Sequence, residues 1–365
     1  MYPYRGGIAH FAETMYGGLQ ARGHTMEAVT FTRQYPETLF PGKTQYVTDA
    51  VEHPVPARRL LDTINPASWY KTARHLASLQ PDALIFHYWM PFFAPAYGTV
   101  ARKARKAGAK VLVVVHNALP HERRPGDVAL GRYFLKTAHG CIVMADAVAR
   151  DLERLGLAAQ VRQVVHPVYD IFGEAIPRDE ARRLLGLSSS AQVIIFFGFI
   201  RKYKGLHVLL ESMPHVVEAL PEAHLVVAGE FYDDEDRCRA LIDRHGLREH
   251  VHLYADYIPD AEVARYFSAA DVVVQPYASA TQSGVAQIAF HFDKPVILTD
   301  VGGLAQVVPH EKAGLVVPPE NPEALAEAIV RFFTEKLSPR LTEGVRQEKQ
   351  KYSWDRLYEA VEDLL

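Results

Sequence analysis

The sequence predicts an α/β protein made of two doubly wound domains, each with a parallel sheet covered by helices. Three observations predict this fold. The length of 365 residues fits about two domains of ordinary size. Short β-branched runs recur along the chain, and segments with apolar residues at helical spacing separate them. Several runs are apolar throughout, such as 111–115 and 193–197, which is typical of strands buried on both faces.

Strands and helices alternate through both halves of the chain. The expected strands are 26–32, 83–87, 110–116, 141–144 and 162–165 in the first half, and 193–198, 224–229, 250–254, 271–275, 296–299 and 314–317 in the second. Amphipathic helices are indicated by apolar stripes at residues 8–19 and 263–270, and by a last stripe at Trp354, Leu357, Tyr358, Val361 and Leu364. A strand followed by a proline at His166-Pro167 marks the boundary. We expect a first domain over 1–168 and a second over 169–345.

The beginning of the chain departs from the usual order of elements. A doubly wound domain normally opens with a strand that leads into its first glycine-rich loop, whereas here Gly6-Gly7 arrives at once. We expect the first strand to be missing, and a sheet built without it is the alternative. A missing strand should leave a sheet edge exposed or covered by another segment.

Composition excludes several classes of protein. The formal net charge of -3 gives no bulk electrostatic case for nucleic-acid binding. Two distant cysteines, Cys141 and Cys238, exclude a disulfide scaffold and suit a reducing cytosol. We find no apolar run of membrane-spanning length and no signal peptide, and therefore expect a cytoplasmic protein.

Two loops carry residues suited to anion binding. In the first, residues 196–205 read FFGFIRKYKG, so that Arg201 and Lys204 lie between a strand and a helix start. Two cations and free helix-end amides could together hold a diphosphate, and a basic surface turn is the alternative. In the second, residues 276–285 read PYASATQSGV before a helix. Its amides could bind phosphate or sugar hydroxyls, or the loop could serve only as a turn and cap.

The order of these motifs resembles glycosyltransferase family 4, the retaining nucleotide-sugar-dependent enzymes with the GT-B fold. The resemblance covers almost the whole chain. It rests on the opening PYRGGI at 3–8, the loops HYW at 87–89 and HNALPH at 116–121, the linker HPVY at 166–169, the clamp at 198–205, and VGGL at 301–304 with AGLVVP at 313–318.

The resemblance implies a GT-B fold of two Rossmann-like domains facing across a cleft, with a C-terminal helix, residues 346–365, crossing back to the first domain. It also implies site residues. Catalytic roles fall to His116, Arg201 and Lys204. Donor-binding roles fall to Gly6, Gly7, Arg201, Lys204, Tyr257, Ile258, Gln282, Ser283 and Gly284, with Tyr257 and Ile258 flanking the base and Ser283 offering its hydroxyl to phosphate. Acceptor-side roles fall to His87, Trp89, Asn117 and His121.

Two positions depart from the family pattern. Where the family carries two glutamates eight positions apart, this chain has Ala280 and Ile288. Ile288 cannot accept a hydrogen bond from a ribose, and Gln282 could partly substitute for the earlier glutamate. No histidine or carboxylate group has a convincing metal-ligand spacing, so we expect no metal and no cofactor.

The leading function is therefore a retaining transferase that uses a nucleotide diphosphate sugar, linked to UDP or GDP, with a glycan, a lipid-linked glycan or a small molecule as acceptor. The alternatives are a catalytically degenerate nucleotide-binding protein and a GT-B nucleotide-sugar epimerase. A dehydrogenase is less favoured, because this sequence has no Gly-x-Gly-x-x-Gly turn after a strand.

The aromatic residues 88–93 lie near the basic residues Arg102, Lys103, Arg105, Lys106 and Lys110 in sequence. This predicts either peripheral membrane contact or core packing beside a solvated helix face.

Overall fold

The chain folds into two compact units. A computed structural model describes residues 1–37, 40, 42–47, 54–119, 124–157, 159–169, 171–280 and 283–365. Unit 1 contains Met1–His166 and Ser353–Leu365, and unit 2 contains Pro167–Tyr352. The first unit thus ends two residues before the expected boundary, and the segment that returns to it starts at Ser353 rather than at residue 346.

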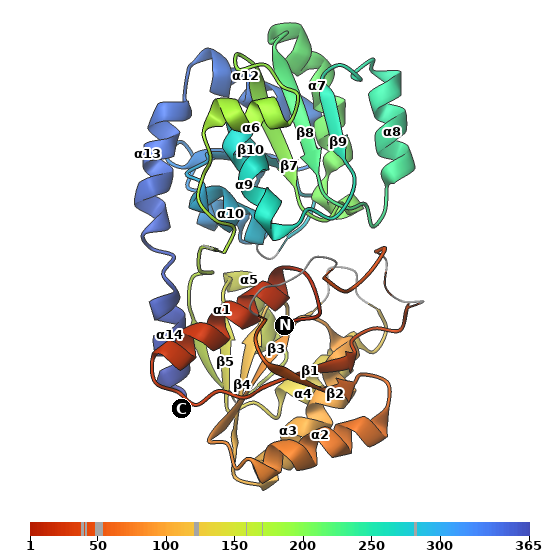
Figure 1. Ribbon diagram of the computed structural model, residues 1–365, viewed down its shortest axis with the longest axis vertical. Helices are drawn as coiled ribbons and strands as arrows, with labels where there is room; N and C mark the ends of the chain where they lie inside the picture. Colours follow the sequence, from red (N-terminus) through yellow and green to blue (C-terminus); the bar gives the residue numbers. More distant parts are fainter. Residues whose placement is uncertain are drawn as a thin grey trace. The chain divides into compact units, whose positions relative to one another are not determined.

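The strands of unit 1 form two parallel sheets (Figure 1). One pairs β1 (Ala28–Arg33) with β2 (Ala57–Asp62). The other has the order β3-β4-β5-β6, with β3 at Ala83–Tyr88, β4 at Lys110–Val115, β5 at Gly140–Val143 and β6 at Gln160–Gln163. Before Gly6, the described backbone forms only an isolated bridge between Tyr4 and Tyr46. Within the described residues, β1 and β3 therefore each keep one edge without a strand partner.

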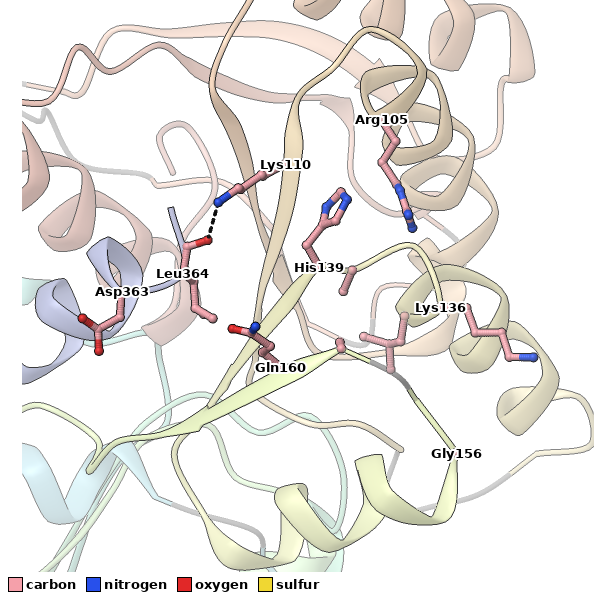
Figure 2. Close-up of a pocket in the computed structure, with 11 residues that line it drawn as sticks. Arg105, Lys110, Lys136, His139, Gly156, Gln160, Asp363 and Leu364 are labelled. Atoms are coloured by element: carbon pink, nitrogen blue, oxygen red, sulfur yellow. Dashed lines mark hydrogen bonds between the residues drawn. The ribbon is translucent and has the colours of Figure 1, made fainter.

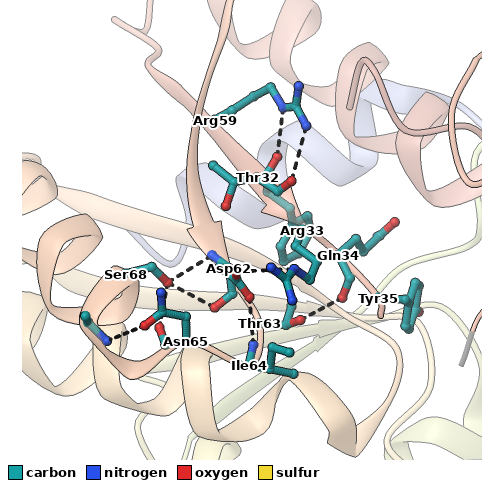
Figure 3. Close-up of polar contacts among 12 residues, drawn as sticks. Thr32, Arg33, Gln34, Tyr35, Arg59, Asp62, Thr63, Ile64, Asn65 and Ser68 are labelled. Atoms are coloured by element: carbon teal, nitrogen blue, oxygen red, sulfur yellow. Dashed lines mark hydrogen bonds and ion pairs between the residues drawn. The ribbon is translucent and has the colours of Figure 1, made fainter. Parts of the chain in front are cut away.

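Strand β2 is absent from our sequence-based expectations, and its composition explains why. Its residues Ala57–Asp62 read ARRLLD, and the two arginines are exposed. Figure 3 shows charged side chains of β1 and β2 that link the two strands. Arg59 donates to the carbonyls of Phe31 and Thr32 at 3.1 and 3.2 Å, and Arg33 pairs with Asp62 at 3.3 Å. An edge strand stabilised by its charged side chains does not show the apolar pattern by which strands are recognised.

Helices pack on both sheets of unit 1. They are α1 (Gly7–Ala21), α2 (Pro66–Ser78), a short 3-10 helix η2 (Pro91–Phe93), α3 (Ala94–Lys106), α4 (Asp127–Leu135), α5 (Asp146–Arg154) and α14 (Trp354–Glu362). Their core includes aromatic residues from both sheets: Tyr97 of α3 lies 6.2 Å from Phe31 and 5.1 Å from Phe86, measured between ring centroids. Helix α3 therefore joins the two sheets into one hydrophobic core.

Helix α14 belongs to unit 1 because it packs against α1. The ring of Trp354 lies 5.0 Å from that of Phe11, and Arg22 binds Glu362 with both Nε and Nη2, at 2.8 and 2.7 Å. The ring of Tyr358 occupies the space beside Gly18, where an added Cβ would lie 1.9 Å from the Tyr358 hydroxyl. A glycine on α1 thus makes room for the returning helix.

Unit 2 contains one six-stranded parallel sheet in the order β12-β11-β10-β7-β8-β9. Its strands are β7 (Gln192–Phe197), β8 (Ala223–Ala228), β9 (Val251–Tyr254), β10 (Val272–Gln275), β11 (Val296–Thr299) and β12 (Gly314–Val317). Its helices are α6 (Arg178–Leu184), η3 (Lys202–Lys204), α7 (Leu206–Ala219), α8 (Glu235–Arg244), α9 (Asp260–Ala269), α10 (Gly284–His291), α11 (Leu304–Val307), α12 (Pro322–Thr334) and α13 (Ser338–Lys349). This confirms the doubly wound parallel arrangement expected for the second half, because the chain order reverses between β7 and β10.

A buried arginine anchors α6 to the sheet of unit 2. The side chain of Arg182 is fully buried and donates to Asp271, to the Ala269 carbonyl and to the Ser189 carbonyl, at 2.8, 3.1 and 2.7 Å. Asp271 also accepts from the backbone N–H of Val193 at 2.8 Å. A charge this deeply buried is tolerable because its hydrogen bonds are satisfied.

Candidate functional site

The loop after β7 brings two helix starts together at the carboxyl end of the sheet. Gly205 has φ of 71° and precedes α7, and a Cβ on it would lie 1.9 Å from the carbonyl oxygen of Pro276. Only glycine accepts both this conformation and this approach. The start of α7 is therefore held against the segment that follows β10.

Lys204 lies at the meeting point of these segments. Its ammonium is 3.3 Å from the position that a Cβ on Gly198 would take, and Val285, in the first turn of α10, is 3.4 Å from the same position. Burial, together with the nearby charge of Arg201, lowers the pKa of Lys204 to about 8. No carboxylate contributes to this shift. The site therefore holds a partly desolvated cation that an anionic ligand would stabilise.

Arg201 belongs to an aromatic group at the ends of three neighbouring strands. Its guanidinium lies 5.0 Å from the ring centroid of Tyr232, Tyr232 lies 4.7 Å from Phe199, and Phe199 stacks on Tyr257 at 6.1 Å. The sequence motifs indicated Arg201 and Tyr257 but not Phe199 or Tyr232. Their positions directly after β7 and β8 are the signal that could have identified them, because strand carboxyl ends carry the sites of doubly wound sheets.

The two residues predicted to flank the base, Tyr257 and Ile258, differ in their exposure to solvent. Ile258 is 8% exposed, whereas Tyr257 is partly exposed and stacks on Phe199. Tyr257 is therefore the better placed of the two to contact a base. Gln282, the third donor-side prediction in this region, lies outside the described residues.

Within the described residues, helix α10 begins without a side-chain cap, although a serine stands at the capping position. The backbone of Ser283 is extended, but its hydroxyl makes no bond to the first turn. Instead, the hydroxyl accepts from the side-chain amide of Gln275 at 3.1 Å. The hydroxyl that the family resemblance assigned to phosphate therefore points into the interior, and the amides of Gly284 and its neighbours remain at the helix start.

The two positions where the family carries glutamates are both filled by buried apolar residues. Ala280 is 8% exposed and Ile288 is 7% exposed. Next to Ile288, the side chain of Gln287 is fully buried, and neither its oxygen nor its nitrogen has a hydrogen-bond partner within the described part of the chain. This side of the site therefore offers no carboxylate at the two positions.

In unit 1, two of the predicted histidines form a pair, of which His116 is buried and His87 is half-buried. His87, in β3, and His116, directly after β4, approach within 3.2 Å between Nδ1 and Nε2, and their rings stack. The ring of Phe11 lies edge-on to both and to His166, at 5.8, 5.0 and 5.5 Å. Burial is the main cause that lowers the pKa of His87 to about 3 and the pKa of His116 well below its usual value. Both rings are therefore neutral at physiological pH.

Of the remaining unit 1 predictions, the structure describes Gly6, Gly7, Trp89 and Asn117. Gly6 has φ of 107° and precedes α1, which starts at Gly7 without a side-chain cap. Trp89 donates to the hydroxyl of Tyr35 at 2.8 Å, and Asn117 follows His116 and is partly exposed. The structure does not describe His121.

The structure places the aromatic and the basic residues of this region mostly on different elements. Tyr88 and Phe93 are fully buried in the core, which is the core-packing alternative for the aromatic segment. Four of the basic residues, between Arg102 and Lys106, lie in the second half of α3, and Lys110 begins β4. A different pairing of rings and cations occurs nearby, where Lys103 lies 4.7 Å from the exposed ring of Tyr70 and Arg102 lies 3.7 Å from that of Tyr133.

A separate pocket of about 740 Å³ lies at the amino ends of β4, β5 and β6. Figure 2 shows Arg105, Lys110, Lys136 and His139 around it. Arg105 donates to the Thr137 carbonyl at 2.9 Å, and Lys110 donates to the Leu364 carbonyl at 3.5 Å. These cations satisfy carbonyls near helix ends, and none of the predicted site residues lines the pocket.

The described residues contain no group of three or more histidine, cysteine or acidic side chains arranged to hold a metal ion. Charge at the unit 2 site comes instead from Lys204, Arg201 and the starts of α7 and α10. This combination is chemically suited to bind two linked phosphates, because cations and helix-end amides each favour an anion.

Comparison with known proteins gives the same family for both units. Residues 6–168 match the family described as "Glycosyl transferase 4-like domain", and residues 191–335 match "Glycosyl transferases group 1". The chain is 26% identical to the putative glycosyltransferase YtcC of Bacillus subtilis over 345 residues, 87% of this chain and 79% of the relative. It is 30% identical to a D-inositol 3-phosphate glycosyltransferase of Corynebacterium urealyticum over 226 residues, 59% of this chain and 53% of the relative.

Solved structures with the same fold include sucrose-phosphate synthase from Thermosynechococcus elongatus. It matches with a TM-score of 0.76 at 22% identity, over 98% of this chain and 92% of that chain. Anabaena HepE, solved in complex with UDP-glucose, matches with a TM-score of 0.71 at 17% identity, over 85% of each chain. At these identities the likeness shows the GT-B fold.

Proposed function

Because the chain belongs to the group 1 glycosyltransferases, we propose that it transfers a sugar from a nucleotide diphosphate sugar to an acceptor, with retention of the anomeric configuration. One observation carries the donor class. Lys204, Arg201 and the uncapped start of α10 converge after β7 and β10, and the pKa of Lys204 is lowered in the absence of any carboxylate partner. A diphosphate would supply the missing negative charge.

In the proposed reaction, the cations stabilise the leaving diphosphate. Negative charge develops on the diphosphate as the bond to the sugar breaks, and Lys204 with the α10 amides lies where that charge would form. A phosphate oxygen of the leaving group takes the proton from the acceptor hydroxyl, so that no protein nucleophile is required. Metal independence follows as part of the proposal, since side-chain cations and helix ends provide the positive charge.

We assign the acceptor side to unit 1. The neutral His116 and His87 pair, with Trp89 and Asn117, lies at the carboxyl ends of β3 and β4. Neutral imidazoles can accept or donate hydrogen bonds to sugar hydroxyls, and indole rings suit the apolar faces of sugars. These residue types support a glycan, a lipid-linked glycan or a small hydroxylated molecule as acceptor.

The test is a screen of labelled nucleotide sugars with product detection. UDP-glucose comes first, because HepE is solved in complex with it, and GDP-linked sugars follow. Transfer to an added glycan or release of the sugar supports an enzyme, and NMR of the anomeric proton reports retention or inversion. Nucleotide binding without transfer or hydrolysis would favour a degenerate binding protein. Conversion of the donor sugar into its epimer would favour an epimerase.

A cytoplasmic enzyme at the membrane surface is a further part of this proposal. No helix within the described ranges is long and apolar enough to cross a membrane, and Cys141 and Cys238 are both buried and free. The cation-ring pairs of Lys103 with Tyr70 and Arg102 with Tyr133 support peripheral contact. Flotation with anionic and neutral liposomes at low salt tests it, and equal failure to bind both favours a freely diffusing acceptor.

A further inference from the structure

Ser283 stands at the N-cap position of α10, but it does not bond to its helix as the capping residues of α12 and α14 do. Ser353, at the same position of α14, accepts from the backbone N–H of Asp355 at 3.1 Å, and Asn321 caps α12 by accepting from Ala324 at 3.0 Å. Ser283 precedes α10 with the extended backbone that a cap requires, yet caps nothing. The difference lies in what binds the side chain.

Gln275 is the residue that diverts the Ser283 hydroxyl. Gln275 is the last residue of β10 and is 1% exposed, and Ser283 is 7% exposed. The Nε2 of Gln275 donates to the Ser283 hydroxyl at 3.1 Å. The oxygen of the same Gln275 amide has no partner within the described residues. A buried amide with an unpaired oxygen costs stability, so this arrangement of Gln275 lowers the stability of the fold.

We propose that Gln275 is a positioning residue that keeps the Ser283 hydroxyl away from the start of α10, so that the amides of that helix remain available to the donor diphosphate. The inference rests on the proposed function. Serine is among the strongest N-capping residues because its oxygen accepts from the second or third helical N–H. A capping Ser283 would therefore compete with phosphate for the same amides, beside Lys204.

The test measures the affinity of UDP by calorimetry in three variants of the full chain. Gln275→Met keeps the approximate volume of the side chain but removes its donor, and it should weaken UDP binding about fivefold because the freed hydroxyl caps α10. Ser283→Ala removes the competitor and should leave UDP affinity within about twofold of the parent protein. The double variant should return to the affinity of Ser283→Ala, which a merely structural role of Gln275 would not produce.

Ser212→Ala serves as a control, because that buried hydroxyl of α7 bonds only within its own helix, to the carbonyl of Leu209. It should leave UDP affinity unchanged. Weaker binding by Ser283→Ala alone would overturn the inference, since the hydroxyl would then bind phosphate directly. Unchanged affinity of Gln275→Met would also overturn it. Failure of the parent protein to bind UDP or GDP would instead count against the proposed function.

Discussion

At the scale of single residues, we expect Lys204 to make the proposed nucleotide binding depend on pH. A diphosphate binds the protonated ammonium better, and the pKa of Lys204 without ligand is about 8. As pH rises through 8, the free protein loses the charge, so that affinity for UDP should fall by about tenfold between pH 7 and pH 9. Calorimetry at the two pH values measures this change.

Lys204→Arg is the matched control for that titration. A guanidinium stays charged at pH 9, so the affinity of this variant should be nearly constant over the same interval. Lys204→Ala should bind UDP about ten- to a hundredfold more weakly, since a hydrogen bond to a charged group contributes roughly 1.5–3 kcal/mol. An equal fall with pH in the parent and in Lys204→Arg would assign the titration to another group.

His116 should affect turnover more than donor affinity. Burial keeps the pKa values of His116 and His87 below their usual range, so the rate should show no loss due to their protonation near neutral pH. His116→Ala should lower kcat by about 10²-fold or more with UDP affinity nearly unchanged. A variant that only lowers the melting temperature would show that the residue is structural.

At the scale of elements, the anchoring of α6 can be tested by two arginines that bind one aspartate. Arg182 is fully buried and Arg178 is half exposed, and both bind Asp271, at 2.8 and 2.9 Å. Arg182→Met should lower the free energy of unfolding by about 3–5 kcal/mol, because Asp271 loses its buried partner. Arg178→Met should cost about 1 kcal/mol or less. Urea unfolding of both variants gives the comparison, and similar costs would contradict it.

The sequence predicted elements well where they depend on apolar pattern. All eleven expected strands are present within a few residues, and most of them are buried and carry apolar runs, although β6 is exposed. β2 was missed because Arg58 and Arg59 face solvent on an edge strand. Within the site, motif order indicated Arg201, Lys204 and His116. The diversion of Ser283 by Gln275 depends on a side-chain rotamer, which no spacing in the sequence encodes.

At the scale of the whole molecule, the two units should respond to different changes. The returning helix α14 buries Leu357, Tyr358 and Val361 in unit 1, whereas Lys204 lies in unit 2. Truncation after Tyr352 should therefore destabilise unit 1 by several kcal/mol, as the loss of about three buried apolar side chains implies. UDP should raise the melting temperature of unit 2.

Calorimetric unfolding with and without UDP separates these effects. The expected pattern is a low-temperature transition that shifts with truncation and a second transition that shifts with nucleotide. Gly18→Ala is a milder version of the truncation, because its added Cβ would meet the hydroxyl of Tyr358. It should move the same transition as the truncation, and a shift in the nucleotide-sensitive transition would contradict the assignment of α14 to unit 1.

The division of the unit 1 strands into two sheets has a practical consequence for handling the protein. β1 and β3 present parallel, partly apolar edges whose backbone groups lack strand partners within the described residues. Unpaired edges of this kind are templates for strands from other molecules. Concentrated or warmed samples are therefore expected to exchange strands and aggregate through unit 1, and crystallisation should benefit from a peptide or fusion that occupies those edges.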